Sequence, residues 1–262
     1  MKKHSIIDNP SVSRIIFFPR KIAIPEKLES NVEILRFDIG NKIIIGGFIF
    51  KINKNFPTIL LFHGNGEIAI DYQSIAPLYF ECGVNLAVVD FRGYGFSSGT
   101  PYFTSLITDS MPIFEKFVEW IKINDFMLSI FVQGRSLGSA CAAEIGSKNP
   151  KELRGIIFES AFGSIFNMMT RLFRIESPNL NPEVLEPFSN DFKAKFIRKP
   201  CLILHGTSDW IIPYYESKLL FNSIPSDIEK KLVLIEGAGH NDILYYKEKY
   251  FSELKEFITR HK

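Results

Sequence analysis

The sequence is poor in cysteine. Only three cysteines, Cys82, Cys141 and Cys201, occur in 262 residues, and they lie far apart beside apolar residues rather than in paired CxxC spacing. An odd number of cysteines at such spacing is not typical of a disulfide framework or of a zinc site. We therefore expect three reduced thiols packed in a core.

Long apolar runs are also missing. No stretch of the sequence reaches the ~18 consecutive apolar residues that a membrane span requires. The first three residues, Met-Lys-Lys, resemble the charged start of a signal peptide, but residues 4–10 (HSIIDNP) interrupt the apolar region that would have to follow. We expect no integral membrane span and a cytoplasmic location.

Neither sign of charge dominates. The chain has 31 lysines and arginines against 29 aspartates and glutamates, whereas a nucleic-acid-binding domain ordinarily has a basic excess. A P-loop motif is absent, and the glycine-rich residues 93–99 lack dinucleotide-binding spacing because Pro101 follows them instead of a helix. No His, Cys and carboxylate cluster has metal-ligand spacing. We expect no nucleic-acid partner, no cofactor and no metal.

Apolar residues, by contrast, are abundant. They make up 46% of the chain and include 25 phenylalanines, while the charged fraction of 23% is ordinary, which excludes the composition of a disordered chain. A chain of this length can bury roughly 70–75% of its unfolded surface. Because we find no repeat, low-complexity tract or Pro/Gly/Ser-rich linker, we expect residues 1–262 to form one domain that opens with an N-terminal arm over residues 1–30.

Short apolar, β-branched runs alternate with amphipathic stretches, a pattern that predicts an α/β fold with helices on both faces of a sheet of about eight mostly parallel strands. Residues 31–37 and 42–51 flank Gly40-Asn41 and predict an antiparallel hairpin. The parallel strands are expected at residues 58–62, 85–90, 129–133, 153–159, 201–205 and 231–236. The helices are expected at residues 68–82, 105–122, 137–147, 214–223 and 243–261.

Residues 163–199 interrupt this alternation just before the penultimate strand. The segment is much longer than a crossover requires. Part of it has an apolar face, formed by Met168, Met169, Leu172, Phe173 and Ile175. We predict a short cap-like insertion over the sheet.

Ser136 is the candidate nucleophile. It lies in Gly134-Arg135-Ser136-Leu137-Gly138, which matches G-x-S-x-G, follows the apolar strand SIFVQ and leads into a helix rich in small residues. This context predicts a nucleophile elbow, in which flanking glycines allow a tight turn that exposes the serine hydroxyl. An ordinary glycine-rich turn is the alternative.

A serine hydroxyl needs a base and a group that orients the base. His4 and His261 lie near the ends of the chain, and His63 and His205 each end a predicted strand before a glycine, as turn-packing residues would. His240, on a glycine-rich loop after the last strand, remains as the candidate base.

The orienting acid is expected after the penultimate strand, where Asp209 lies. Glu159, at the end of the preceding strand, is the competing candidate. Asp90 and Asp242 are expected to brace loops or cap helices.

Attack on an acyl carbon creates an oxyanion that requires N–H donors. The backbone N–H of Leu137, next to the nucleophile, is the first candidate. The loop His63-Gly64-Asn65-Gly66 supplies the second, with Asn65 preferred and Gly66 as the alternative.

Six motifs carry a family resemblance: HGNG at residues 63–66, VDFRGYGFSSG at 89–99, GRSLGS at 134–139, ESAF at 159–162, HGTSDWIIP at 205–213 and EGAGHND at 236–242. In this order, from about Phe17 to the end, the chain resembles the α/β-hydrolase superfamily, especially the depalmitoylase-type α/β-hydrolase-domain-containing proteins and their bacterial relatives. The resemblance implies Ser136, Asp209 and His240 as a catalytic triad. The N-terminal cysteine cluster of the eukaryotic depalmitoylases is missing here, so membrane targeting by its lipidation is not expected.

The resemblance also implies a serine-dependent hydrolysis of acyl esters or thioesters, which we predict to proceed through an acyl-enzyme. The insertion at residues 163–199 would then provide a shallow apolar acyl pocket, with a sheet-covering helix as the alternative. A serine peptidase, an acyltransferase, or a non-catalytic binding protein on the same scaffold remain alternatives, since a fold does not determine a function.

Overall fold

The computed structural model describes residues 6–175, 177 and 180–262. One sheet of eight strands runs through them, in the order β1-β2-β4-β3-β5-β6-β7-β8. The strands are β1 (Val32–Asp38), β2 (Ile44–Phe50), β3 (Thr58–Phe62), β4 (Asn85–Val89), β5 (Ile130–Arg135), β6 (Leu153–Glu159), β7 (Cys201–Gly206) and β8 (Lys230–Ile235).

The strand directions divide the sheet in two. β1 and β2 form the predicted hairpin, and β2 also pairs antiparallel with β4. From β4 to β8 every pairing is parallel. The α/β-hydrolase fold predicted from the sequence is therefore confirmed, and the carboxyl ends of six strands lie along one edge, where loops that are distant in sequence can meet.

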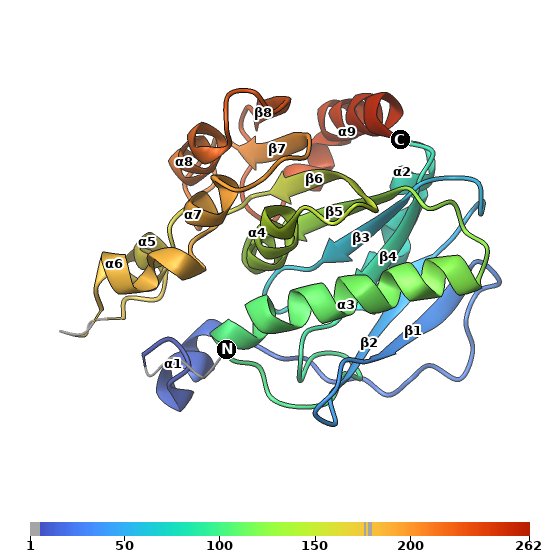
Figure 1. Ribbon diagram of the computed structural model, residues 1–262, viewed down its shortest axis with the longest axis horizontal. Coiled ribbons are helices and arrows are strands. Elements are labelled where there is room, and N and C mark those ends of the chain that lie inside the picture. The colour runs from blue at the N-terminus through green and yellow to red at the C-terminus, as the bar shows by residue number, and fades with distance from the viewer. Residues whose placement is uncertain (1–5, 176, 178–179) are drawn as a thin grey trace.

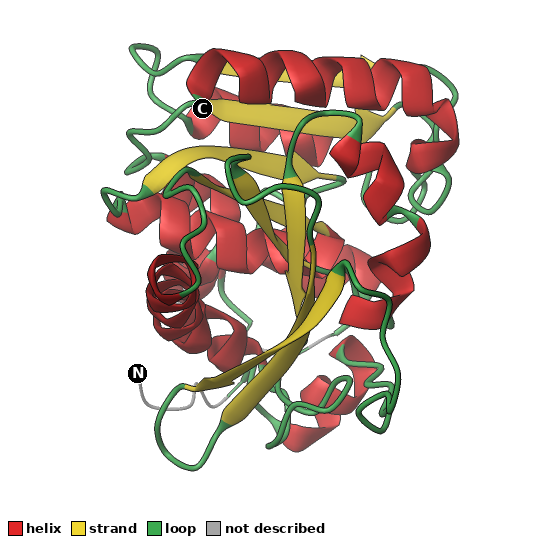
Figure 2. Ribbon diagram, turned by 90° about the vertical axis from the view of Figure 1, so that its right-hand side faces the viewer, coloured by secondary structure: helices red, strands yellow, loops and turns green. Residues whose placement is uncertain are grey.

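Apolar side chains cover both faces of this sheet. In β3, Leu60 and Phe62 belong to one hydrophobic cluster, whereas Ile59 and Leu61 belong to the other. Alternate residues of a strand point to opposite faces, so the uninterrupted run TILLF supplies both cores. Figure 2 shows the twisted sheet with helices on its two sides.

The helices are α1 (Pro10–Ile16), η1 (Ala69–Ser74), α2 (Ala76–Phe80), α3 (Phe103–Ile123), η2 (Ser136–Gly138), α4 (Ser139–Lys148), α5 (Ile165–Asn167), η3 (Met168–Leu172), α6 (Pro182–Leu185), η4 (Glu186–Phe188), α7 (Asn190–Ala194), α8 (Tyr215–Ser223), η5 (Ile243–Tyr246) and α9 (Lys247–His261). α3, α4, α7 and α8 pack in succession over one face. α2 and α9 contribute to the core of the other (Figure 1).

The helix predicted at residues 68–82 is divided into η1 and α2. Pro77 stands in the first turn of α2. Proline has no N–H and is disfavoured inside a helix but accepted in its first turn, so a new helix starts there. The prediction of one continuous helix was wrong at this point.

The long connection at residues 163–199 divides into two parts, of which the later one is the predicted sheet-covering helix. α7, near its end, packs between α4 and α8 and covers the sheet. The earlier part, α5 and η3, lies beyond the carboxyl edge of the strands, on the same side of the molecule as α1 (Figure 1). Residues 176, 178 and 179 of this connection lie outside the described residues.

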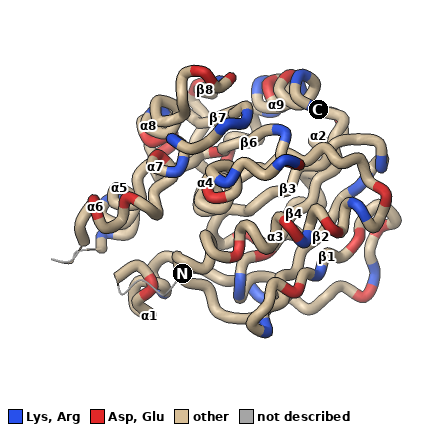
Figure 3. Tube along the Cα trace, viewed as in Figure 1, with Lys and Arg blue, Asp and Glu red and all other residues tan. Residues whose placement is uncertain are grey.

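Basic and acidic side chains are interspersed along the chain trace (Figure 3). Within residues 6–175, 177 and 180–262, no helix combines the length and the hydropathy needed to cross a bilayer.

Candidate active site

Ser136 lies at a sharp turn between β5 and α4 and has a φ of 51°, in the left-handed region that L-residues rarely adopt. The turn brings the chain against neighbouring backbone. A Cβ on Gly138 would lie 2.1 Å from the Phe62 carbonyl oxygen, and one on Gly134 would lie 2.6 Å from the Gly138 carbonyl oxygen. Only glycine fits at these two positions, so the G-x-S-x-G pattern is required by the shape of the turn.

A chain of hydrogen bonds joins the three side chains predicted to act together. The Ser136 hydroxyl lies 2.9 Å from His240 Nε2, and His240 Nδ1 lies 2.7 Å from Asp209 Oδ2. The carboxylate can only accept, so Nδ1 carries the proton and Nε2 is left to accept from the serine. The side chains are nearly buried, with Ser136 8% and Asp209 5% exposed.

Asp209 is held by its own loop. Its Oδ1 accepts the backbone N–H groups of Ile211 and Ile212 at 2.9 and 2.8 Å. Burial by itself raises the pKa of Asp209, but the hydrogen bonds from His205 and His240 outweigh this effect and hold the pKa well below its usual range. The carboxylate therefore stays ionised and fixed in direction.

His205, at the end of β7, spans the same loop. Its Nε2 lies 2.7 Å from the Ile212 carbonyl oxygen and 3.3 Å from Asp209 Oδ2. Its Nδ1 contacts the hydroxyl of Ser217 in α8. The turn-packing role predicted for His205 is confirmed, and these contacts shape the loop that presents Asp209.

The loop after β3 reaches the same pocket through Asn65. The Asn65 side chain binds the arm that precedes β1: Oδ1 accepts the Phe18 N–H at 3.0 Å, and Nδ2 donates to the Ile16 carbonyl. The Tyr94 hydroxyl also donates to Oδ1, at 2.7 Å. Among the described residues, the main-chain N–H of Asn65 has no acceptor, whereas the Gly66 backbone contacts the Tyr94 hydroxyl. Asn65 and Leu137 both line the pocket above Ser136.

Arg135 connects the loops of the site. The sequence did not predict this role. Its Nη2 lies 3.2 Å from the His240 carbonyl oxygen and 3.2 Å from Asn241 Oδ1. Its Nε lies 3.2 Å from carboxylate oxygens of Glu67 and Glu159. Although burial lowers the pKa of Arg135, these two carboxylates raise it above its ordinary value. The position inside G-x-S-x-G was the available signal, but only the fold shows what the guanidinium reaches.

Glu159 binds this arginine rather than the histidine. Its Oε2 accepts from Gln133 Nε2 at 2.8 Å and from the Tyr250 hydroxyl at 2.6 Å. Burial raises the pKa of Glu159, and Arg135 and Tyr250 offset only part of that effect. Of the two candidate acids, the structure brings Asp209 to His240 and places Glu159 in a buried network behind the elbow.

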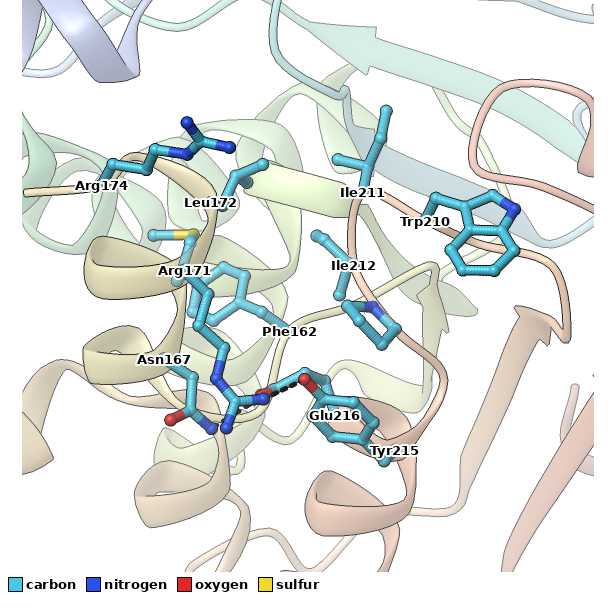
Figure 4. A pocket seen from close by; sticks show the side chains of 12 residues that line it. Phe162, Asn167, Arg171, Leu172, Arg174, Trp210, Ile211, Ile212, Tyr215 and Glu216 are labelled. Atoms are coloured by element: carbon cyan, nitrogen blue, oxygen red, sulfur yellow. Dashed lines mark hydrogen bonds between the residues drawn. The ribbon is translucent and has the colours of Figure 1, made fainter.

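A cavity of about 270 Å³ opens above Ser136 and His240. Met168, Leu172 and Phe173 form one wall of it, and Ile211 and Ile212 form another. The apolar face predicted in residues 163–199 therefore does border the site. A second cavity of about 280 Å³ adjoins it and shares Met168, Leu172, Ile211 and Ile212 as lining residues (Figure 4).

The other polar candidates have structural contacts. His63 is fully buried, with Nδ1 2.7 Å from the Gly64 carbonyl oxygen. Asp90 accepts the Ala69 N–H, and Asp242 accepts the Gly239 N–H, as the loop-bracing prediction requires. His261 packs against Phe257, and His4 lies outside the described residues. Within the described ranges, His, Cys, Asp and Glu form no group of three that could hold a metal ion.

Comparison with known proteins gives matches along most of the chain. The protein bem46 of Schizosaccharomyces pombe is 27% identical over 243 residues, which cover 90% of this chain and 80% of bem46. The alpha/beta hydrolase domain-containing protein 17B of Xenopus tropicalis is 28% identical over 212 residues, 78% of this chain. The chain spans 66% of the length of that relative.

Among solved structures, the esterase Pf2001 of Pyrococcus furiosus superposes with a TM-score of 0.73 at 20% identity, covering 93% of this chain and 98% of that one. This similarity shows the fold. Residues 53–185 match the sequence model of the serine aminopeptidase S33 family. They include Asn65, Ser136 and Leu137 and end before Asp209 and His240. With half of its length matched, the chain belongs to the serine aminopeptidase S33 family of α/β-hydrolases.

Proposed function

We propose that this protein is a serine hydrolase that cleaves acyl esters or thioesters, with Ser136 as nucleophile, His240 as base and Asp209 as orienting acid. The observation that carries the proposal is the continuous hydrogen-bond chain from Asp209 through His240 to Ser136 at the floor of a partly apolar cavity. Membership of a hydrolase family and the esterase-like fold support it.

In the first half of the reaction, His240 Nε2 takes the Ser136 proton as Oγ attacks the acyl carbon. Asp209 holds the Nδ1–H and stabilises the imidazolium that forms. The oxyanion is directed to the N–H groups of Leu137 and Asn65, each commonly worth a few kcal/mol in the transition state. The intermediate then collapses, and the alcohol or thiol leaves with the proton from His240.

In the second half, a water molecule gives a proton to His240 Nε2 and attacks the acyl-serine, releasing the acid and restoring the Ser136 hydroxyl. The same groups act in both halves in reversed proton roles. Apart from the substrate and this water, both halves use only side chains and N–H groups of the chain.

The family description favours a second candidate, an aminopeptidase, which would need a carboxylate for the substrate ammonium. Glu67 lines the cavity. Its oxygens are occupied by Arg135, by the Gly64 N–H at 2.8 Å and by the Tyr72 hydroxyl at 2.7 Å. A neutralised carboxylate recognises an ammonium poorly, so ester or thioester cleavage fits this site better.

The test combines fluorophosphonate labelling with turnover of p-nitrophenyl esters, acyl thioesters and aminoacyl p-nitroanilides. We expect labelling and ester turnover by the wild type, and loss of both in Ser136→Ala. Ser252→Ala, a change on the exposed face of α9, is the matched control and should behave as wild type.

Ester turnover retained in Ser136→Ala would refute the assignment. Preferential cleavage of the anilides would favour the peptidase. A folded wild type without labelling or turnover would favour a binding protein on this scaffold.

A further inference from the structure

The second cavity continues the apolar surface of the first. Met168 and Leu172 on one side and Ile211 and Ile212 on the other line both cavities. A substrate whose reacting carbonyl lies at Ser136 can therefore extend an apolar chain past these four side chains into a space of about 280 Å³. The far part of a substrate meets residues that the reaction itself does not use.

Two arginines line this second cavity. Arg171 and Arg174 lie at the end of η3 and in the residues after it, both with exposed side chains. Figure 4 shows both extending from the same segment, Arg174 on the side of Ile211 and Arg171 toward Tyr215. Among the described residues neither arginine has a carboxylate partner, and Arg171 contacts only the neutral hydroxyl and ring of Tyr215.

The acid that lines the same cavity, Glu216, does not neutralise these arginines. It is 4% exposed, and its Oε2 accepts the N–H groups of Gly163 and Ser164, each at 3.0 Å. Its Oε1 accepts from Asn167 Nδ2 at 2.7 Å. Its three donors are uncharged groups, so Glu216 forms no ion pair with either arginine, and in the described lining of the cavity two guanidinium groups face a single carboxylate beside an apolar wall.

We propose that the preferred substrates are esters or thioesters with an apolar chain that ends in an anionic oxygen group, bound by Arg171 and Arg174. This inference rests on the proposed function and adds the substrate class. The anion belongs either to the acid that is transferred to Ser136 or to the alcohol or thiol that leaves, and the two cases are separable by substrate design.

The first arm places the charge on the acid. It compares kcat/KM for the mono-p-nitrophenyl ester of suberic acid, with the far carboxyl free, and for the same compound with that carboxyl methylated. The second arm places the charge on the leaving group, with octanoate esters of para-hydroxyphenylacetic acid and of its methyl ester. We expect the free carboxylate to be preferred roughly three- to tenfold in one arm, the range for a partly exposed charged pair.

The variants test whether the arginines cause the preference. Arg171→Gln with Arg174→Gln should reduce the ratio between charged and methylated substrate to about one, since the attraction disappears. Arg171→Lys with Arg174→Lys keeps both charges and should retain most of the ratio. Arg36→Gln with Arg154→Gln removes two exposed arginines from β1 and β6 and should leave the ratio as in the wild type.

Binding separates this inference from the catalytic assignment. In Ser136→Ala, calorimetry with monomethyl suberate and dimethyl suberate measures the preference for the carboxylate without turnover. Equal behaviour of charged and methylated compounds in both arms, or a preference that survives the double glutamine variant, would overturn the inference. Absence of both ester turnover and serine labelling would refute the proposed function, while calorimetry would still decide whether the arginines bind the anion.

Discussion

Two neighbouring strands, β6 and β7, lead to the site, and each supplies a buried carboxylate from its carboxyl end. Glu159 is the last residue of β6, and Asp209 follows β7 by three residues. Glu159 is 1% and Asp209 5% exposed. Asp209 reaches His240, whereas Glu159 points to Arg135, Gln133 and Tyr250.

The difference follows from where each carboxylate lies relative to the end of its strand. A side chain within the strand is confined to one face of the sheet, and Glu159 remains in the network behind the elbow. The loop after β7 carries Asp209 beyond the edge and stabilises it with the Ile211 and Ile212 N–H groups. The pKa values of the two carboxylates are also shifted in opposite directions. Burial dominates at Glu159 and raises its pKa, whereas at Asp209 several hydrogen-bond donors outweigh burial and lower the pKa.

The largest effect is expected from Asp209→Asn. The amide would donate to or misalign His240 and favour the wrong tautomer, so we expect kcat to fall about 10³–10⁴-fold with little change in KM. Ester turnover and circular dichroism of the purified variant measure this. A loss below tenfold would show that another acid orients His240.

A smaller effect is expected at Arg135, which we regard as a positioning residue that holds the backbone of His240. Arg135→Gln removes the donor to the His240 carbonyl and should reduce kcat about 10–100-fold, because small misplacements of a catalytic group are costly. Arg135→Lys keeps the charge and should recover part of kcat. If both variants changed only the melting temperature, a positioning role would be refuted.

Glu159→Gln should have a smaller effect still. Arg135 keeps Glu67 as a partner, so we expect kcat/KM to fall less than about tenfold and the free energy of unfolding to fall by about 1–3 kcal/mol. Because Glu159 acts through Arg135, the double variant with Arg135→Gln should lose less kcat than the product of the single losses. A 10³-fold loss in Glu159→Gln alone would transfer the acid's role to Glu159.

The smallest effect concerns the opposite end of β7, where Cys201 begins the strand. All three cysteines are free and buried. Burial raises the pKa of Cys82 to about 11 and also raises that of Cys201. The native protein should therefore not react with a thiol reagent at neutral pH and should keep its ester turnover, while the denatured chain should show three reactive thiols. Inactivation of the native protein by the reagent would contradict this.

Most of the sheet could be predicted from the sequence, because a strand buried on both faces needs an unbroken apolar run, as in TILLF and CLILH. The tight turn at Ser136 could also be predicted, since the approach of Gly138 to Phe62 leaves no room for a side chain. The split of the helix at residues 68–82 could have been predicted from Pro77. The contacts of Arg135 could not, because they join loops that are distant in the sequence, such as the contact with the His240 carbonyl oxygen, which spans 105 positions.

The sequence by itself determined the alternation of strands and helices, the tight turn at Ser136 and the set of residues available for the site, since local sterics and hydrophobic periodicity depend on near neighbours in the chain. Only the tertiary structure decided which acid meets His240, which residue joins the loops and which part of residues 163–199 borders the cavity. Those outcomes depend on strand order and loop direction, because parallel pairing brings six strand ends to one edge of the sheet and thereby makes neighbours of distant residues.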